Sequence, residues 1–332
     1  MNKRRLDIMA STEVNTDTIS HPTKRNHYAI QTFRISRKFG NFVAVDGIDL
    51  SIKEGELFAL LGPNGAGKTT AIKILCCLLR PSSGTATIMG HDIQKDPIAV
   101  KQIIDLSPQE TAIATHLNAW ENLSLMGRMH GFGKEEVKRR SEELLEMMGL
   151  TKRAKEQVRK YSGGMKRRLS IAMALVSDPQ VLFLDEPTLG LDPQSRRSVW
   201  EYMEELKGKK TIVLTTHYLE EADSLADRIA IMDEGKIIAL GTSGELKDSI
   251  SDMQVMVVKA KNLTVDAIEG LKELYAEVRE VEDGVEIKAK ELSFDKIVDY
   301  LRLKGIVIES TSLKQITLDD VFLHLTGKGL RE

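Results

Sequence analysis

The segment ELFALLGPNGAGKTTAIKIL, residues 56–75, limits the possible folds of this chain more than any other feature. It contains the pattern G-x-x-x-x-G-K-T between an apolar run and a helical stretch, which predicts a buried strand, a glycine-rich turn and a helix. The glycines allow the backbone N–H groups and the helix N-terminus to face phosphate groups, while Lys68 adds a positive charge and Thr69 a hydroxyl suited to Mg²⁺. The residues predicted to bind the nucleotide are Gly62, Pro63, Asn64, Gly65, Ala66, Gly67, Lys68, Thr69 and Thr70.

The apolar run VLFLD, residues 181–185, is followed at once by a second acidic residue. In a parallel sheet the carboxyl end of such a strand lies at the functional edge, so Asp185 and Glu186 are expected beside the phosphates. Asp185 is then the candidate carboxylate for Mg²⁺, and Glu186 is the candidate base that orients the attacking water. An acidic strand end is more often a helix cap or a solvated edge, but the phosphate loop upstream favours the catalytic interpretation.

Three further residues fit the same site, although each has a plainer explanation when taken alone. Gln109, in LSPQE, offers an uncharged oxygen to the magnesium and water shell, but a loop glutamine is usually just exposed. His217 ends the strand TIVLTTH, where an imidazole can reach the γ-phosphate or can simply be packed. Phe39, in SRKFGN, can stack on adenine or belong to the core. Beside a phosphate loop, these residues predict the remainder of a site for ATP and Mg²⁺.

The stretch YSGGMKRRLS, residues 161–170, is a second glycine-rich loop, and it opens a basic helix. A serine hydroxyl, backbone N–H groups and a helix N-terminus again form a phosphate-binding arrangement. One nucleotide does not require two such loops from one polypeptide. The second loop therefore needs an explanation of its own.

The order of apolar and polar segments divides the chain into a tail and two domains. Residues 1–29 are polar and aperiodic, which predicts a disordered tail. From 30 to 246, apolar runs alternate with helical segments, the pattern of a largely parallel α/β sheet, with a hairpin turning at 233–236. Residues 92–161 show no convincing strand and are expected to form an inserted helical subdomain. Residues 252–328 have the order βαββαβα, which predicts a small ferredoxin-like α+β domain.

Composition narrows the class of protein further. The net charge of −2 by itself neither favours nor excludes a class of partner, but no extended basic face is evident in the sequence, and nucleic acid is not an expected partner. Cys76 and Cys77 are adjacent in an apolar run, where reduced core residues are expected rather than a disulfide. No run approaches the length of about 18 apolar residues that a membrane span needs, and the first residues lack the apolar segment of a signal peptide. The sequence therefore favours a cytoplasmic protein.

The phosphate loop, Gln109, YSGGM, LFLDEP, LGLD and His217, in this order and spacing, resemble the motifs of the ATP-binding cassette (ABC) ATPases over about residues 30–246. Within this superfamily, RKFGNFVAVDGIDLSIKEGE, YSGGMKRRLSIAMALVSDPQVLFLDEPTLGLDP and LDDVFLHLTG are similar to the ATPase subunits of daunorubicin-resistance-like type-two exporters. Tyr161 and Met165 replace the leucine and glutamine of the commonest signature, LSGGQ, while the serine and the glycines remain. The resemblance implies an α/β P-loop NTPase fold of the ABC type.

The resemblance also explains the second loop. In ABC proteins the signature loop, here Ser162, Gly163 and Gly164, completes the ATP site of the other subunit in a head-to-tail dimer, and Asp192 is likewise implied at the partner's site. ATP then holds two protomers together until hydrolysis separates them. The implied roles in the chain's own site are catalysis by Lys68, Glu186 and His217, Mg²⁺ binding by Thr69, Gln109 and Asp185, and adenine stacking by Phe39.

The function implied by the resemblance is that of an ATPase subunit at the cytoplasmic face of the membrane. It is expected to act as a homodimer and to power multidrug export through a separate membrane permease. The insertion after Gln109, LNAWENLSLMGRMHGF, is expected to dock a short helix of the permease. Its candidate apolar anchors are Trp120, Leu123, Met126 and Phe132.

Two other classes of function remain open from the sequence. A soluble ATP-dependent switch acting on ribosomes or DNA is disfavoured because the chain has one cassette and no long heptad run. A nucleotide-binding regulator without catalysis is disfavoured because Lys68 and Glu186 are both present.

Overall fold

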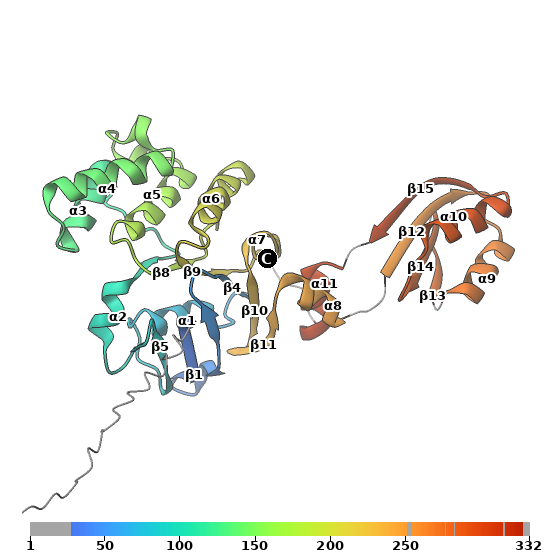
Figure 1. Cartoon of the computed structure of the whole chain (residues 1–332), viewed down its shortest axis with the longest axis horizontal. Helices are drawn as coiled ribbons and strands as arrows, with labels where there is room; N and C mark the ends of the chain where they lie inside the picture. The colour runs from blue at the N-terminus through green and yellow to red at the C-terminus, as the bar shows by residue number, and fades with distance from the viewer. Residues whose placement is uncertain (1–27, 251–253, 276, 282, 315, 328–332) are drawn as a thin grey trace, which may run out of the picture.

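The computed structural model describes residues 28–250, 254–275, 277–281, 283–314 and 316–327 (Figure 1). The expected disordered tail, residues 1–29, lies outside the described residues except for its last two, which begin strand β1 (Tyr28–Phe39). None of the helices in the described ranges combines the length and the hydropathy that a membrane span needs.

The larger part of the molecule, called the main domain below, is built on a sheet of mostly parallel strands, as the sequence predicts. The strand order is β11-β10-β4-β9-β8-β7, and β10 and β11 pair antiparallel through the predicted hairpin. The strands are β4 (Leu57–Leu61), β7 (Ile104–Ser107), β8 (Val181–Asp185), β9 (Thr211–Thr216), β10 (Arg228–Asp233) and β11 (Lys236–Gly241). Because β4, β9 and β8 are parallel neighbours, their carboxyl ends meet at one edge of the sheet.

Helices and a further sheet cover the two faces of this sheet. In β4, Leu57 and Leu61 contact one core and Phe58 the other, since successive side chains of a strand point to opposite faces. Burial on both faces explains why the strand is apolar throughout. The helices beside the sheet are α1 (Lys68–Leu75), α2 (Pro97–Ile103), α5 (Gly163–Leu175), α6 (Pro193–Leu206) and α7 (Leu219–Leu225) (Figure 1).

The main domain contains a second, antiparallel sheet, which the sequence pattern does not separate from the predicted parallel sheet. It consists of β1, β2 (Phe42–Ile48), β3 (Ser51–Lys53), β5 (Ser83–Ile88) and β6 (His91–Asp92). Ile30, Ile52 and Ile88 of this sheet pack in the same core as Phe58. The second sheet therefore covers one face of the main sheet, while many of its other residues are exposed or half-buried. This mixture gives its strands a weak hydrophobic pattern in the sequence.

The helical subdomain is shorter than the predicted range 92–161. Residues 104–107 form strand β7, which pairs in parallel with β8 at the edge of the main sheet. This strand is short and contains a polar Asp105, so it gains its stability from pairing rather than from a recognisable local pattern. The subdomain proper contains α3 (Ala119–Met129), α4 (Lys134–Met147) and the 3₁₀ turns Thr151–Arg153 and Val158–Lys160.

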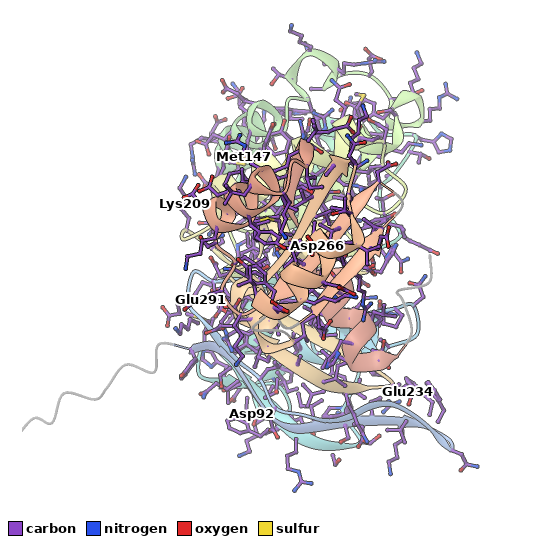
Figure 2. All side chains as sticks on the ribbon, turned by 90° about the vertical axis from the view of Figure 1, so that its right-hand side faces the viewer. Asp92, Met147, Lys209, Glu234, Asp266 and Glu291 are labelled. Atoms are coloured by element: carbon purple, nitrogen blue, oxygen red, sulfur yellow. The ribbon has the colours of Figure 1, made fainter. Side chains whose placement is uncertain are left out.

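The C-terminal domain has a separate sheet and core. Its elements are β12 (Gln254–Lys261), α9 (Val265–Leu274), β13 (Glu277–Val281), β14 (Gly284–Ala289), α10 (Phe294–Leu303) and β15 (Val307–Lys314). The strand order is β13-β14-β12-β15 with antiparallel neighbours, which is compatible with a ferredoxin-like βαββαβ unit. Met256, Ile287 and Leu301 lie in its core. Figure 2 views the molecule from this side, with the labelled Asp266 on α9.

The last helix lies outside the core of the C-terminal domain, in contrast to the predicted range 252–328. Helix α11 (Leu318–Thr326) packs on α8 (Ser243–Ile250) and α7 (Figure 1). Phe322 is buried in the same core of the main domain as Leu246 of α8. The apolar side of α11 finds its partner there because α9 and α10 already supply the helical half of the C-terminal core. The C-terminal domain is thus inserted between two helices that pack together.

Candidate active site

The phosphate loop connects the end of β4 to the N-terminus of α1. Gly67 has a φ of +102°, and a Cβ at this position would lie 2.2 Å from the backbone oxygen of Ala44, so the loop requires glycine here. Nζ of Lys68 donates hydrogen bonds to the backbone oxygens of Gly62 (2.6 Å) and Pro63 (3.2 Å). The residues predicted to bind phosphate therefore form one loop closed by the Lys68 ammonium.

Thr69 and Asp185 meet beside this loop. Oγ1 of Thr69 donates to Oδ1 of Asp185 over 3.1 Å, and Oγ1 of Thr215 donates to the same oxygen over 2.6 Å. Asp185 is held in place because β8 pairs with β9, which carries Thr215. A hydroxyl and a carboxylate next to a phosphate loop fit Mg²⁺, which prefers a few protein oxygens together with water and phosphate oxygens. The geometry is therefore compatible with the predicted metal role of this pair.

Glu186 lies at the centre of the ionic contacts of the site. Its Oε1 is 3.1 Å from Nζ of Lys68, and its Oε2 is 2.7 Å from Nδ1 of His217. Its φ is +49°, a strained value for a residue with a side chain, and its N–H is held by the carbonyl (3.2 Å) and hydroxyl (3.0 Å) oxygens of Thr215. The structure thus brings the three predicted catalytic side chains together from α1, β8 and the end of β9.

Gln109 and Phe39 lie at the margins of this cluster. Gln109 is exposed after β7, and in the described part of the chain no hydrogen bond joins its side chain to Thr69 or Asp185. Phe39 ends β1 with 46% of its surface exposed, and the guanidinium of Arg37 lies 4.6 Å from the centre of its ring. The magnesium role of Gln109 and the stacking role of Phe39 stay predictions.

The signature loop is exposed at Ser162 and Gly163 and begins helix α5. Oγ of Ser162 caps this helix by accepting a hydrogen bond from the N–H of Met165 over 3.3 Å. Tyr161 is buried, and its hydroxyl donates to a backbone carbonyl of the helical subdomain over 2.7 Å, which explains how tyrosine is accommodated. Among the residues described, no hydrogen bond or ion pair joins Ser162, Gly163 or Gly164 to the phosphate loop of the same chain.

Asp192 is the N-cap residue of α6 and is also exposed. Its carboxylate accepts hydrogen bonds from the N–H (3.0 Å) and the hydroxyl (2.7 Å) of Ser195, and these bonds hold the pKa of Asp192 below its usual value. A Cβ at Gly164 would lie 2.5 Å from Oγ of the same serine, so the glycine allows α5 and α6 to approach closely. The signature loop and Asp192 therefore lie near each other, although the partner's site that they are predicted to serve is not tested by one chain.

Two buried charged residues belong to the site's surroundings, and the motifs do not identify them. Arg167 of α5 is 4% exposed and donates to the backbone carbonyls on both sides of Glu186. Glu221 of α7 is fully buried, and its Oε1 accepts hydrogen bonds from Oγ1 of Thr188 (2.8 Å) and Nε1 of Trp200 (3.0 Å). Burial raises the pKa of Glu221. In the sequence, Arg167 and Glu221 could have been noticed as charged residues on the apolar side of a helix.

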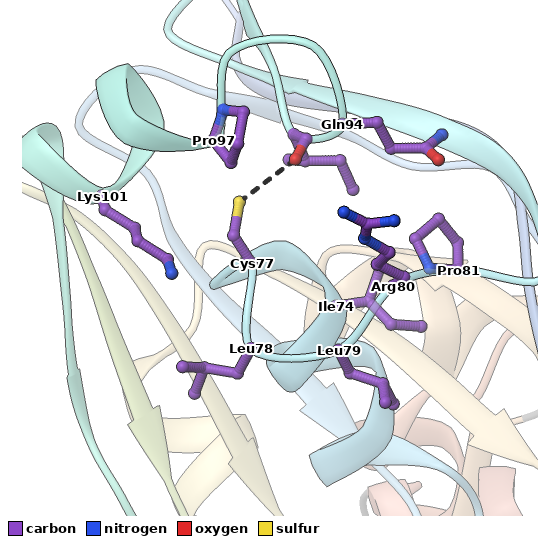
Figure 3. Close-up of a pocket in the computed structure, with 10 residues that line it drawn as sticks. Ile74, Cys77, Leu78, Leu79, Arg80, Pro81, Gln94, Pro97 and Lys101 are labelled. Atoms are coloured by element: carbon purple, nitrogen blue, oxygen red, sulfur yellow. Dashed lines mark hydrogen bonds between the residues drawn. The ribbon is translucent and has the colours of Figure 1, made fainter.

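Cys76 and Cys77 are both free thiols, in agreement with the sequence. Cys76 is buried, but Cys77 lines a pocket of about 460 Å³ together with Arg80 and Lys101 (Figure 3), which corrects the expectation that both are core residues. Sγ of Cys77 lies 3.4 Å from the backbone oxygen of Ile93. Burial raises the pKa of both thiols, so neither is primed as a nucleophilic thiolate.

Comparisons with known proteins agree with this geometry. A family profile described as "ABC transporter" matches residues 45–189. The chain is 40% identical over 307 residues to a daunorubicin resistance ATP-binding protein of Streptomyces coeruleorubidus, covering 91% of this chain and 97% of the relative. It is 38% identical over 312 residues to the linearmycin resistance ATP-binding protein of Bacillus subtilis (91% and 100% covered). It is 36% identical over 312 residues to the Nod factor export ATP-binding protein I of Cupriavidus metallidurans (91% and 99% covered).

Solved structures extend the similarity to the fold. A nucleotide-free ATP-binding cassette from an ABC transporter superposes with a TM-score of 0.62 at 26% identity, covering 67% of this chain and 95% of that one. A dimeric ATP-binding cassette in a post-hydrolysis state, bound to ADP and phosphate, superposes with a TM-score of 0.59 at 27% identity, covering 64% and 98%. The chain therefore belongs to the ATP-binding cassette transporter family, among the relatives of the daunorubicin resistance ATP-binding proteins, and it is an ATPase.

Proposed function

We propose that this ATPase is the nucleotide-binding subunit of an export complex and powers transport through a separate membrane permease. The observation that carries the proposal is the arrangement of two phosphate-binding loops. Lys68 of the first loop pairs with Glu186, which also contacts His217, whereas the exposed signature loop has no hydrogen bond to the first loop within the described chain. The names of the relatives, which refer to resistance and to export, support the direction of transport.

The site supports hydrolysis of the terminal phosphate of ATP. The oxygen of a water molecule attacks the γ-phosphorus, and the bond from that phosphorus to the bridging oxygen of ADP breaks. Glu186 orients the water and accepts its proton, while Lys68 exchanges its contact with Glu186 for one with the phosphate. Mg²⁺ bound through Thr69 and Asp185 would neutralise charge between the β- and γ-phosphates. His217 holds Glu186 from the other side.

The exposed position of the signature loop supports a head-to-tail homodimer. The exposed Ser162 and Gly163, at the N-terminus of α5, can meet the γ-phosphate of ATP bound to a second protomer through the hydroxyl and backbone N–H groups. Two identical loops then produce two composite sites related by a twofold axis. ATP joins the protomers, and its hydrolysis allows them to separate.

The helical subdomain offers a docking pocket for the permease, which would place the ATPase peripherally on the cytoplasmic face of the membrane. A pocket of about 1040 Å³ has an apolar lining at Trp120 and Leu145, and its charged lining residues are three glutamates and two lysines: Glu121, Glu142, Glu146, Lys152 and Lys155. Of the predicted anchors, Leu123 is fully buried and belongs to the core, which corrects its assignment. We propose that a short cytoplasmic helix of the permease occupies this pocket and that basic residues on it face the glutamates.

A mixed-dimer experiment tests whether the signature loop serves the other chain. All protomers carry Glu186→Gln to block turnover, and two tags allow mixed dimers to be purified. One protomer carries Lys68→Ala and the other Ser162→Arg. If the loop acts across the dimer, both lesions fall in one composite site, and the mixed dimer retains one ATP after desalting. If the loop serves its own chain, both sites are damaged and no ATP is retained.

The matched control carries both lesions in a single protomer beside a partner with neither. The two interpretations then exchange their outcomes: action across the dimer leaves no intact site, whereas action within one chain leaves one. Retention of one ATP in the control and of none in the mixed dimer would overturn the proposed dimer. Thermal unfolding of each purified protomer tests whether Ser162→Arg, which removes an N-cap, leaves the chain folded.

A further inference from the structure

Arg167 is the buried cation of the helix that begins with the signature loop. It stands in the run MKRRL, where its neighbours Lys166 and Arg168 are only half-buried, yet Arg167 itself is 4% exposed. Its guanidinium donates hydrogen bonds to backbone carbonyl oxygens of four residues, namely Asp185 (2.8 Å), Pro187 (2.8 Å), Pro108 (2.5 Å) and Gln109 (3.5 Å).

These carbonyl groups belong to two segments of the chain's own ATP site. Asp185 and Pro187 stand on either side of the proposed base Glu186, and the other two carbonyls lie in the loop that contains Gln109. The N-cap residue of α5, in contrast, is Ser162, which serves the other ATP site in the proposed dimer. One planar cation therefore connects the segments of one composite site to the helix of the other.

Arg167 is hydrogen-bonded by backbone carbonyl groups, and the nearby carboxylates of Asp185, Glu221 and Glu186 also favour its charged form. In the described part of the chain its hydrogen bonds go to carbonyl oxygens and not to a carboxylate. Burial lowers the pKa of Arg167 to about 10, which still leaves it protonated at neutral pH. A buried charge must keep its hydrogen-bond partners, so a displacement of the Glu186 segment relative to α5 is opposed. The guanidinium fork spans several acceptors in one plane, and a lysine ammonium cannot reproduce that geometry.

We propose that Arg167 is a positioning residue that couples the two composite sites, because it transmits the position of the Glu186 segment in one site to the signature loop that completes the other. This inference rests on the dimer proposed above. It assigns Arg167 no contact with ATP. A substitution of Arg167 must therefore change ATP hydrolysis at both composite sites, including the site whose catalytic glutamate belongs to the partner.

Mixed dimers separate the effect of Arg167 on Glu186 of its own chain from its effect on the signature loop that completes the other site. The first protomer carries Lys68→Ala, so the working site combines the second protomer's phosphate loop with the first protomer's signature loop. Arg167→Lys is then placed in either protomer. In the second protomer it disturbs the working Glu186, and kcat should fall by roughly 10- to 100-fold. In the first protomer it disturbs the working signature loop, and the KM for ATP should rise by about tenfold or more with a smaller change in kcat.

The matched control is Arg168→Lys in the same two positions. Nη1 of Arg168 donates to the backbone oxygen of Met148 over 3.0 Å, so this arginine connects α5 to the helical subdomain and not to the Glu186 segment. An unchanged KM with Arg167→Lys in the first protomer overturns the coupling. Equal losses with Arg168→Lys also overturn it, because they show a general loosening of α5. If the lysine variant does not assemble, the neutral Arg167→Gln is tested with the same expected split.

A reference dimer distinguishes failure of this inference from failure of the proposed dimer. It carries Lys68→Ala and Ser162→Arg together in the first protomer and no change at Arg167. If signature loops act across the dimer, this reference has lost both sites and is inactive. Activity in the reference refutes the dimer itself, whereas an inactive reference with an unaffected KM in the Arg167 dimers refutes only the coupling.

Discussion

Nδ1 of His217 lies 2.7 Å from Oε2 of Glu186, and the two side chains come from the ends of neighbouring parallel strands. The other oxygen of Glu186 faces Lys68 at 3.1 Å. Glu186 is thus held from both sides in a buried position with a strained backbone. A carboxylate fixed in this way is suited to orient a water molecule rather than to move with solvent.

Glu186→Gln should nearly abolish turnover while ATP binding is kept. The amide has a similar shape but cannot accept a proton from water, so kcat should fall by roughly 10²–10⁴-fold. Steady-state hydrolysis and equilibrium nucleotide binding measure the two effects, and size-exclusion chromatography with ATP should show an accumulated dimer. Near-normal hydrolysis by this variant would remove Glu186 from the role of base.

Charge reversal at the pocket of the helical subdomain should weaken assembly with the permease. Glu142→Lys combined with Glu146→Lys reverses the charge of two of its lining residues, and the complex should bind about tenfold more weakly if basic residues face them. The isolated ATPase should keep its turnover. Glu143→Lys, on the same helix α4 but outside the pocket lining, is the matched control. Equal co-purification of all variants with the permease would place the dock elsewhere.

The free energy of unfolding of the Glu221→Gln variant should increase relative to that of the native chain as the pH rises. The pKa of Glu221 is raised by burial, so the folded chain keeps a proton that the unfolded chain loses above the ordinary value of about 4.3. The native free energy of unfolding therefore falls as pH increases from there toward the raised pKa, by up to about 1.4 kcal/mol per pH unit from this group. Glutamine is neutral in both states and lacks this contribution.

Denaturant unfolding between pH 5 and pH 8 measures this difference, with the exposed neighbour Glu220→Gln as control. The control should follow the native pH dependence. A constant difference between Glu221→Gln and the native chain across this range would show that Glu221 does not retain its proton on folding.

The sequence predicted that Lys68, Glu186 and His217 lie together, because phosphate chemistry restricts both residue type and spacing. A glycine turn before Lys68 and an acidic strand end at Asp185 have few other uses when they occur together. Arg167 could not be predicted in the same way, because its partners are backbone carbonyls, which carry no sequence signal. Its burial becomes evident only when α5 is packed against the Glu186 segment.

The fold shows the same division between local pattern and tertiary context. The apolar run of β8 identifies a buried strand by itself, whereas β7 becomes a strand only by pairing with β8. The periodicity of α11 predicts an apolar face but not the surface that it contacts. That surface belongs to α8 and α7, on the far side of the inserted C-terminal domain in the sequence.

Phe322→Ala should therefore destabilise the main domain, although Phe322 follows the C-terminal domain in the chain. The side chain is 2% exposed in the core that also contains Leu246, and truncation of a buried phenylalanine costs about 3–5 kcal/mol. Leu301→Ala, in the separate core of the C-terminal domain, is the matched control, with an expected cost of about 2–5 kcal/mol. Calorimetry with and without ATP identifies the unfolding of the main domain, because nucleotide binding raises the temperature of that transition. Phe322→Ala should lower the temperature of the nucleotide-dependent transition, and Leu301→Ala should lower the other one. If Phe322→Ala instead affects only the transition that is insensitive to ATP, α11 is stabilised by the C-terminal domain and its placement against α8 is wrong.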